Sequence, residues 1–378
     1  MTSARQLSEI ESVRGIAALL VCIYHIPMWQ PDLFNIPFIR SSHVMVELFF
    51  VLSGFVICRA YGERLTSWQA LGRFQWLRFG RLYPVHLLFL GFWLAVEFAK
   101  FWLTANTSID SPNTQPFGQN SVGALIEQLF LVQSLGFSNH ATTFNFPAWS
   151  ISTEFYTYLI FGLLALLIPR QRVGASALLI LGCLGLLVFW ADGIGTFDKM
   201  LRCLAGFFIG CLAYEGLKQA EQAGHKPWPA ILLALSLVSI LVFLWIKPAD
   251  RRFDLLIFPL TAGLLACVVL CREGFVNRWL RHKLLLKLGL ISYSVYMGHV
   301  SVIWTVTQFF RVVLRRSEVV MANGQSVPVL SAAEAAAAYG FVIVATLLLA
   351  SLVYRLIENP ARMWSRQVAW SGIATRTS

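Results

Sequence analysis

The feature that most constrains the fold is a series of ten long apolar segments that carry very few charges. They fall at about residues 15–28, 44–60, 83–103, 149–168, 174–191, 200–216, 228–246, 254–271, 288–310 and 335–357. An α-helix needs about 20 apolar residues to cross the hydrocarbon core of a bilayer. A helix also satisfies its own backbone hydrogen bonds, which lipid cannot do for it. The sequence therefore predicts an all-α, polytopic integral membrane protein with about ten transmembrane helices.

Composition supports this interpretation and excludes other classes. Of the 378 residues, 57% are hydrophobic and only 13% are charged, whereas soluble domains have about 45–50% apolar and about 25% charged residues. So few charges could not cover the surface of a soluble enzyme, and the apolar content is too high for a disordered chain. The seven cysteines fall in or beside apolar segments without metal-ligand spacing. We therefore expect buried thiols, with neither disulfides nor a metal.

The net charge of +11 agrees with basic residues gathering in the cytoplasmic loops of a membrane protein, and we expect no nucleic-acid partner. Basic clusters at 170–172 and 272–287 lie on the cytoplasmic side if the segment 124–135 does not cross the membrane. If it crosses, there are eleven helices and these loops face outward. The positive-inside rule favours ten crossings, with both termini cytoplasmic and 124–135 re-entrant or interfacial. Three arginines remain exceptions because they fall outside: Arg311, Arg315 and Arg316.

The chain shows no internal repeat and no linker. It starts without the net-positive region of a cleavable signal peptide, so residues 15–28 are interpreted as a retained helix. We therefore expect a single transmembrane domain at 9–362 with short cytoplasmic tails at 1–8 and 363–378.

Several ionisable residues lie inside these apolar segments, where each costs about 2.5–3.5 kcal/mol. Arg14 and His25 are eleven residues apart, which places them on one face of a helix and about 16 Å apart along its axis. His299 lies at mid-depth in the ninth segment, and Ser53 interrupts the second at a similar depth. A lone buried histidine is more often a packing residue than a catalyst. Two of them beside polar residues from other helices favour an internal polar chamber.

The fourth segment contributes further polar groups at its outer end, where the stretch 149–154 brings Ser150, Ser152, Thr153 and Glu154 to a helix N-terminus. Glu154 alone would be explained as a carboxylate that stabilises the helix dipole. On the cytoplasmic side, Arg78 and Arg81 share a helical face one turn apart. Together with Arg14 they suit bidentate phosphate recognition if the first and third helices are neighbours. For any one of them, a topological anchor is the simpler explanation.

Six motifs in a fixed order resemble the bacterial membrane acyltransferase family 3. They are Arg14-Gly-Ile-Ala-Ala with His25, Glu47-Leu-Phe-Phe-Val-Leu-Ser-Gly-Phe, Arg78-x-x-Arg81-Leu-Tyr-Pro, Pro147-Ala-Trp-Ser-Ile-Ser-Thr-Glu, Ser292-Tyr-Ser-x-Tyr-x-x-His299 and Glu358-Asn-Pro. The resemblance covers residues 9 to about 362 and is to the stand-alone type, without a fused esterase-like domain. One departure is Met297-Gly298, where the family usually has bulkier aliphatic residues before the histidine.

The resemblance implies an O-acyltransferase of the bacterial inner membrane. Its co-substrate would be cytosolic acyl-CoA, most often acetyl-CoA, and its acceptor a hydroxyl of an extracytoplasmic sugar or glycan. It also marks Arg14, His25, Arg78 and Arg81 as essential positions. We expect the three arginines to bind the CoA phosphates and His25 to act as general base or first acyl acceptor. The supporting groups would be His299, Ser53, Ser152 and Glu154.

A different class also fits intramembrane histidine and arginine residues. A proton-coupled secondary transporter or flippase for an anionic or glycan substrate would use the same residue types. That class predicts inverted repeats and matching broken helices in two halves, and the sequence shows neither pattern.

Overall fold

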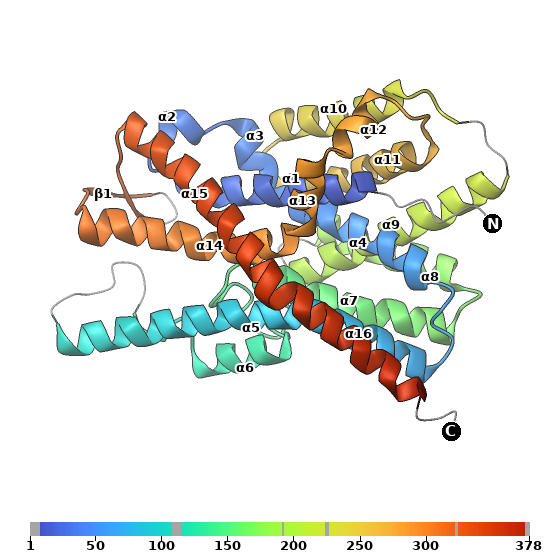
Figure 1. Cartoon of the computed structure of the whole chain (residues 1–378), viewed down its shortest axis with the longest axis horizontal. Coiled ribbons are helices and arrows are strands. Elements are labelled where there is room, and N and C mark those ends of the chain that lie inside the picture. The colour runs from blue at the N-terminus through green and yellow to red at the C-terminus, as the bar shows by residue number, and fades with distance from the viewer. Residues whose placement is uncertain (1–7, 108–114, 191–192, 224–226, 322–323, 375–378) are drawn as a thin grey trace. The chain divides into compact units, whose positions relative to one another are not determined.

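The computed structural model describes residues 8–107, 115–190, 193–223, 227–321 and 324–374 (Figure 1). As far as residue 190, the helices are α1 (Ser8–His25), α2 (Pro31–Phe34), α3 (Pro37–Arg40), η1 (Ser41–Val44), α4 (Met45–Tyr61), α5 (Trp68–Asn106), α6 (Val122–Phe130), α7 (Ala148–Leu167) and α8 (Arg172–Phe189). From residue 193 onward, the helices are η3 (Gly195–Phe197), α9 (Asp198–Gln222), α10 (Ile231–Ile246), η4 (Arg251–Leu256), α11 (Ile257–Leu270), α12 (Phe275–Leu280), α13 (Lys283–Leu290), α14 (Ser292–Gln308), η5 (Phe309–Val313), α15 (Ala332–Val353), η6 (Tyr354–Glu358) and α16 (Asn359–Ala374). A short antiparallel pair, β1 (Glu318–Val320) with β2 (Ser326–Pro328), lies between η5 and α15. The predicted all-α class is confirmed.

Seven of these helical stretches are long and apolar enough to cross a membrane, which makes the chain a multi-pass membrane protein. They are Pro37–Tyr61, Trp68–Asn106, Ala148–Leu167, Arg172–Phe189, Gly195–Gln222, Arg251–Leu270 and Ala332–Ala369. The pair α13 and α14, bent by 69° at its break, raises the number to eight. The predicted count of ten is not confirmed within the described residues. The other two expected spans are α10, which has only 16 residues, and α1, which carries Glu9, Glu11 and Arg14.

The ambiguous segment 124–135 forms a helix too short to cross. α6 has nine residues and is therefore about 14 Å long, less than half of the roughly 30 Å hydrocarbon core. Buried side chains satisfy the backbone that follows it: Gln128 donates to the carbonyl of Thr143 at 2.9 Å, and Gln133 donates to the carbonyl of Ala148 at 3.2 Å. Irregular backbone at membrane depth is tolerated where protein groups supply such hydrogen bonds. The predicted non-crossing segment agrees with this geometry.

The chain folds into two compact units, each built from non-contiguous segments. The first unit comprises Met1–Val21, Pro37–Gln75 and Tyr156–Ser292, and the second unit comprises Cys22–Ile36, Trp76–Phe155 and Tyr293–Ser378. The expected single domain at 9–362 stays a prediction.

In the first unit, α4 packs directly against α9, and α8 and α11 also pack against α9. The contact between α4 and α9 is made by backbone, because a Cβ on Gly54 would lie 1.8 Å from the carbonyl oxygen of Phe207. Small residues that let helix backbones approach are the usual way to pack transmembrane helices, since lipid removes the hydrophobic force between them. All seven cysteines are buried as free thiols.

In the second unit, the chain after α1 is anchored on α15 and η5. Trp29 is fully buried and its ring stacks on Tyr339, with centroids 5.5 Å apart. The Tyr339 hydroxyl donates to the carbonyl of Pro27 at 3.2 Å. These contacts fix the position of the chain just beyond His25.

Two features of this unit bear on the sequence predictions. Two of the three arginines that are exceptions to the expected topology have acidic partners, because Arg311 pairs with Glu318 and Arg316 pairs with Glu334. The tail expected at 363–378 is instead helical as far as Ala374, since α16 continues directly from η6. Residues 1–7 and 375–378 of the predicted tails lie outside the described residues.

Candidate active site

A pair of histidines forms the centre of the site in the second unit. His25 is the last residue of α1 and is half-buried, whereas His299 lies in the middle of α14 and is fully buried. The Nε2 atom of His299 is 3.2 Å from Nδ1 of His25. The two histidines that the sequence singled out are therefore direct hydrogen-bond partners.

The surroundings of His299 determine which nitrogen of each ring carries the proton. Its Nδ1 atom is 3.3 Å from the carbonyl oxygen of Val295, and a carbonyl can only accept, so Nδ1 is the protonated nitrogen. The Nε2 atom of His299 must then accept the proton that Nδ1 of His25 donates. This assignment, made from the hydrogen-bond network, places the lone pair of His25 on Nε2. His25 can accept a proton there.

The chain that leads into α7 is held firmly against α14 beside these histidines. The Asn145 amide donates to the carbonyl of Met297 at 3.1 Å, and its oxygen accepts from the indole of Trp93 at 3.2 Å. Next to it, the ring of Phe146 meets His25 edge-on, with centroids 5.4 Å apart. Ser150 donates to the Tyr296 hydroxyl at 2.9 Å. Loop and helix therefore position Phe146 as a wall beside the His25 imidazole.

The other predicted catalytic residues have different surroundings. Ser152 donates to the carbonyl of Leu131 at 2.6 Å and accepts from the backbone of Ser134 at 3.2 Å, contacts that hold the loop after α6. Glu154 is half-buried on α7. Ser53 belongs to the first unit, where its hydroxyl is 2.9 Å from that of Tyr158. Of these five residues, His25 and His299 are brought into direct hydrogen-bond contact.

The predicted phosphate-binding arginines are divided between the units. Arg14 lies on α1 in the first unit, mostly buried, and pairs with Glu11 at 3.1 Å. Arg78 and Arg81 lie one turn apart on α5 in the second unit, and both are half-buried. One helix carries both Arg14 and His25, as the eleven-residue spacing predicted.

The structure adds a carboxylate that sequence reasoning left without a role. Glu358 on η6 is buried and accepts a hydrogen bond of 2.7 Å from Ser294 on α14, one and a half turns before His299. It interacts electrostatically with Arg81 and Arg362. The Glu-Asn-Pro motif could have marked this residue, but only the structure identifies its partners.

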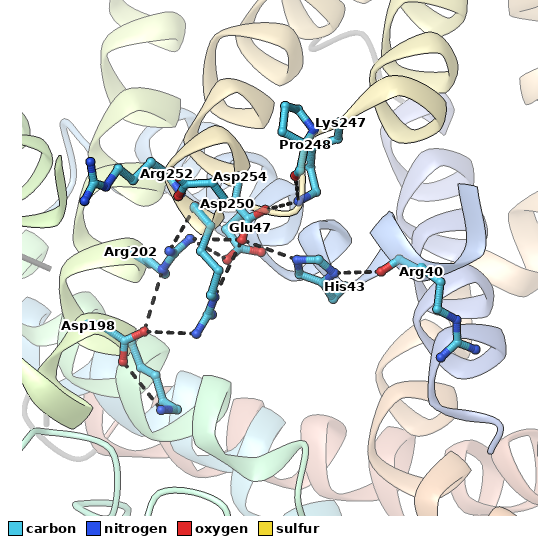
Figure 2. Close-up of polar contacts among 12 residues, drawn as sticks. Arg40, His43, Glu47, Asp198, Arg202, Lys247, Pro248, Asp250, Arg252 and Asp254 are labelled. Carbon is cyan, nitrogen blue, oxygen red and sulfur yellow. Dashed lines mark hydrogen bonds and ion pairs between the residues drawn. The ribbon is translucent and has the colours of Figure 1, made fainter. Parts of the chain in front are cut away.

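A second group of charges that sequence reasoning missed lies in the first unit (Figure 2). The buried Arg202 on α9 contacts Glu47 at 3.4 Å, Asp254 at 3.7 Å and Asp198 at 3.8 Å. Asp254 also forms an ion pair with Lys247 at 2.7 Å and lies 3.3 Å from Nε2 of His43. The network ties together α4, α9, η4 and the segments beside them. Ionisable residues within apolar segments were the available signal for it.

No group of three or more His, Cys, Asp or Glu side chains could hold a metal ion among the residues that the structure describes.

Fold and site together define a multi-pass membrane protein with a hydrogen-bonded imidazole pair, a pairing suited to moving a proton during group transfer. The chain belongs to the family described as "Acyltransferase domain", whose family model matches residues 7–355. The protein is therefore a membrane acyltransferase, and the predicted family is confirmed.

Three relatives illustrate the breadth of this similarity. The chain is 32% identical to "Protein 2 in picA locus" of Rhizobium radiobacter over 152 residues, which is 38% of this chain and 75% of that protein. It is 31% identical to "Acyltransferase MdmB" of Streptomyces mycarofaciens over 184 residues, 44% of this chain and 42% of that protein. It is 22% identical to "Peptidoglycan O-acetyltransferase OatA" of Listeria monocytogenes over 95% of this chain, although the match spans only 56% of that protein. No solved structure matches the chain significantly.

Proposed function

We propose that this membrane acyltransferase moves an acyl group from cytosolic acyl-CoA to a hydroxyl of an extracytoplasmic sugar or glycan. The proposed acyl group is acetyl, which the family transfers most often. The protein would act in the bacterial inner membrane with both termini cytoplasmic. The observation that carries the proposal is the hydrogen-bonded pair of His25 and His299, with the lone pair of His25 on Nε2. The Listeria relative is named as a peptidoglycan O-acetyltransferase, which supports a glycan acceptor and an acetyl group.

The proposed chemistry is thioester alcoholysis. Nε2 of His25 takes the proton of the acceptor hydroxyl as its oxygen bonds to the acyl carbon, and the C–S bond then breaks. The proton passes to the departing thiolate, so an ester and a free thiol are the products. Neutral imidazole suits this role near pH 7. His299 positions His25 by accepting from its Nδ1, and Arg78 and Arg81 hold the phosphates of the donor.

The experiment measures the thiol released from acetyl-CoA by purified protein in liposomes, together with mass spectrometry of cell-surface glycans. We expect His25→Ala to abolish both signals while the protein is still made, because the variant lacks the imidazole that takes the hydroxyl proton. We expect His299→Phe to lower the rate about a hundredfold or more. His299→Gln should retain more activity, since its amide oxygen can still accept from His25.

Two results would overturn the proposal. Wild-type protein that moves a solute but never releases thiol would be a transporter. Full glycan acylation in cells that produce His25→Ala would remove His25 from the chemistry.

A further inference from the structure

α5 and α16 cross closely in the second unit, next to the predicted phosphate-binding arginines. A Cβ on Gly80 would lie 2.3 Å from the Cβ of Ser365, so the absent side chain is what allows the contact. The indole of Trp76 donates to the carbonyl of Ser365 at 3.1 Å, and its ring packs on Trp364 at 5.5 Å. The turn of α5 that carries Arg78 and Arg81 is thereby fixed against α16.

The crossing brings a third guanidinium to this pair. Arg362 on α16 interacts electrostatically with Arg81 and with Arg366 one turn further along. Its Nη1 atom is 3.7 Å from the carboxylate of Glu358, and its side chain is 26% exposed. Arg362 is therefore partly buried among like charges, yet still accessible.

Several guanidiniums gather at this crossing. Arg81 and Arg362 share the carboxylate of Glu358, which is also engaged by the Ser294 hydroxyl at 2.7 Å. Arg366 and Arg78 add further positive charge. Guanidiniums held near one another repel, and several of them fixed around one point form a fork-like site for phosphate oxygens. A phosphate ligand would relieve the repulsion.

We infer that Arg362 completes a phosphate-binding site with Arg78 and Arg81, and that this site holds the phosphates of the acyl-CoA donor. Glu358 and Ser294 position Arg362 and do not touch the ligand. The inference rests on the proposed function and adds a donor-binding residue from the far end of the chain. A phospholipid headgroup presents the same phosphate chemistry, so the experiment separates the two sources.

The experiment measures coenzyme A binding by isothermal titration to purified full-length protein in nanodiscs, once with zwitterionic lipid only and once with anionic phosphatidylglycerol. We expect Arg362→Ala to weaken coenzyme A binding at least tenfold, equivalent to about 1.4 kcal/mol. Arg362→Lys should recover only part of the loss, because an ammonium lacks the planar fork. Arg355→Ala is the matched control, since Arg355 is an exposed arginine on the same helical run, and we expect wild-type affinity.

The outcomes distinguish the inference from the proposed function. Wild-type affinity in both Arg362→Ala and Arg362→Gln, with loss in Arg81→Ala, would overturn the inference and leave the function intact. A second measurement compares the unfolding midpoint with and without phosphatidylglycerol. If this lipid raises the midpoint of wild-type protein but not of Arg362→Ala, and coenzyme A binding is unchanged, the site belongs to lipid and the inference is overturned. Wild-type protein that binds no coenzyme A would overturn both. Arg362→Gln keeps the test valid if Arg362→Ala does not fold.

Discussion

Replacing Gly54 with alanine tests a close helix contact of the first unit. The added Cβ would lie 1.8 Å from the carbonyl oxygen of Phe207, whereas real Cβ contacts essentially never fall below 3.0 Å. The obstacle is backbone and cannot rotate away, so α4 and α9 must separate locally by at least 3.0 − 1.8 = 1.2 Å. Such a displacement cannot be absorbed by a side chain.

The expected cost follows from what the displacement disturbs. Overpacking a close contact costs about 1–3 kcal/mol, occasionally more. Here α4 also carries Glu47, which is 3.4 Å from Arg202, and Ser53, which is 2.9 Å from Tyr158. A shift of more than 1 Å would lengthen both contacts, so we expect the upper end of that range. This corresponds to a fall of about 5 °C or more in the unfolding temperature.

The assay is thermal unfolding of purified protein in detergent at a fixed scan rate, which gives an apparent midpoint that can be compared between variants. Gly182→Ala on α8 is the matched control, because nothing lies within 4 Å of its added Cβ. Alanine is the better helix former by about 1 kcal/mol, so we expect the control to be at least as stable as wild type. A Gly54→Ala variant as stable as Gly182→Ala would refute the reasoning.

Two further predictions concern charged groups of the first unit. Arg202→Met leaves the buried carboxylates of Glu47 and Asp254 without their guanidinium, so we expect the free energy of unfolding to fall by about 3–5 kcal/mol in denaturation assays. Adding Glu47→Gln should recover part of this loss. A variant Arg202→Met that is as stable as wild type, or more stable, would contradict this prediction. Burial alone would raise the pKa of Glu9, but its hydrogen bonds from Arg281 and Asn277 outweigh burial and hold that pKa below its ordinary value of 4.5. The charged carboxylate therefore stabilises the fold above about pH 4.5, and this contribution is lost as the pH falls further. We expect Glu9→Gln to have a lower thermal unfolding midpoint than wild type at neutral pH, and this difference to become smaller as the pH is lowered. A difference that does not change with pH would show that Glu9 acts only through packing.

The class of protein and its helical architecture follow from the amino-acid sequence alone. Apolar runs of membrane length can satisfy their backbone only as helices, so hydropathy sufficed to predict an all-α multi-pass chain. The motif residues were also visible, because ionisable groups in lipid-facing segments need a reason to be there. His25 and His299 are both identifiable in this way. Met297-Gly298, just before His299, departs from the bulkier aliphatic residues that are usual in the family.

Which of these groups meet is a property of the folded chain. His25 and His299 are 274 positions apart in the chain, and no local pattern states that their rings share a proton. The same holds for Glu358 with Arg81, and for Arg202 with the carboxylates of Glu47 and Asp254, which come from two other elements. The expected span 288–310 is broken by a 69° bend between α13 and α14, which hydropathy does not register. Transfer free energy is a property of each residue alone, whereas the way the helices pack determines which residues become partners. Close helix contacts such as those at Gly54 and Gly80 set that packing.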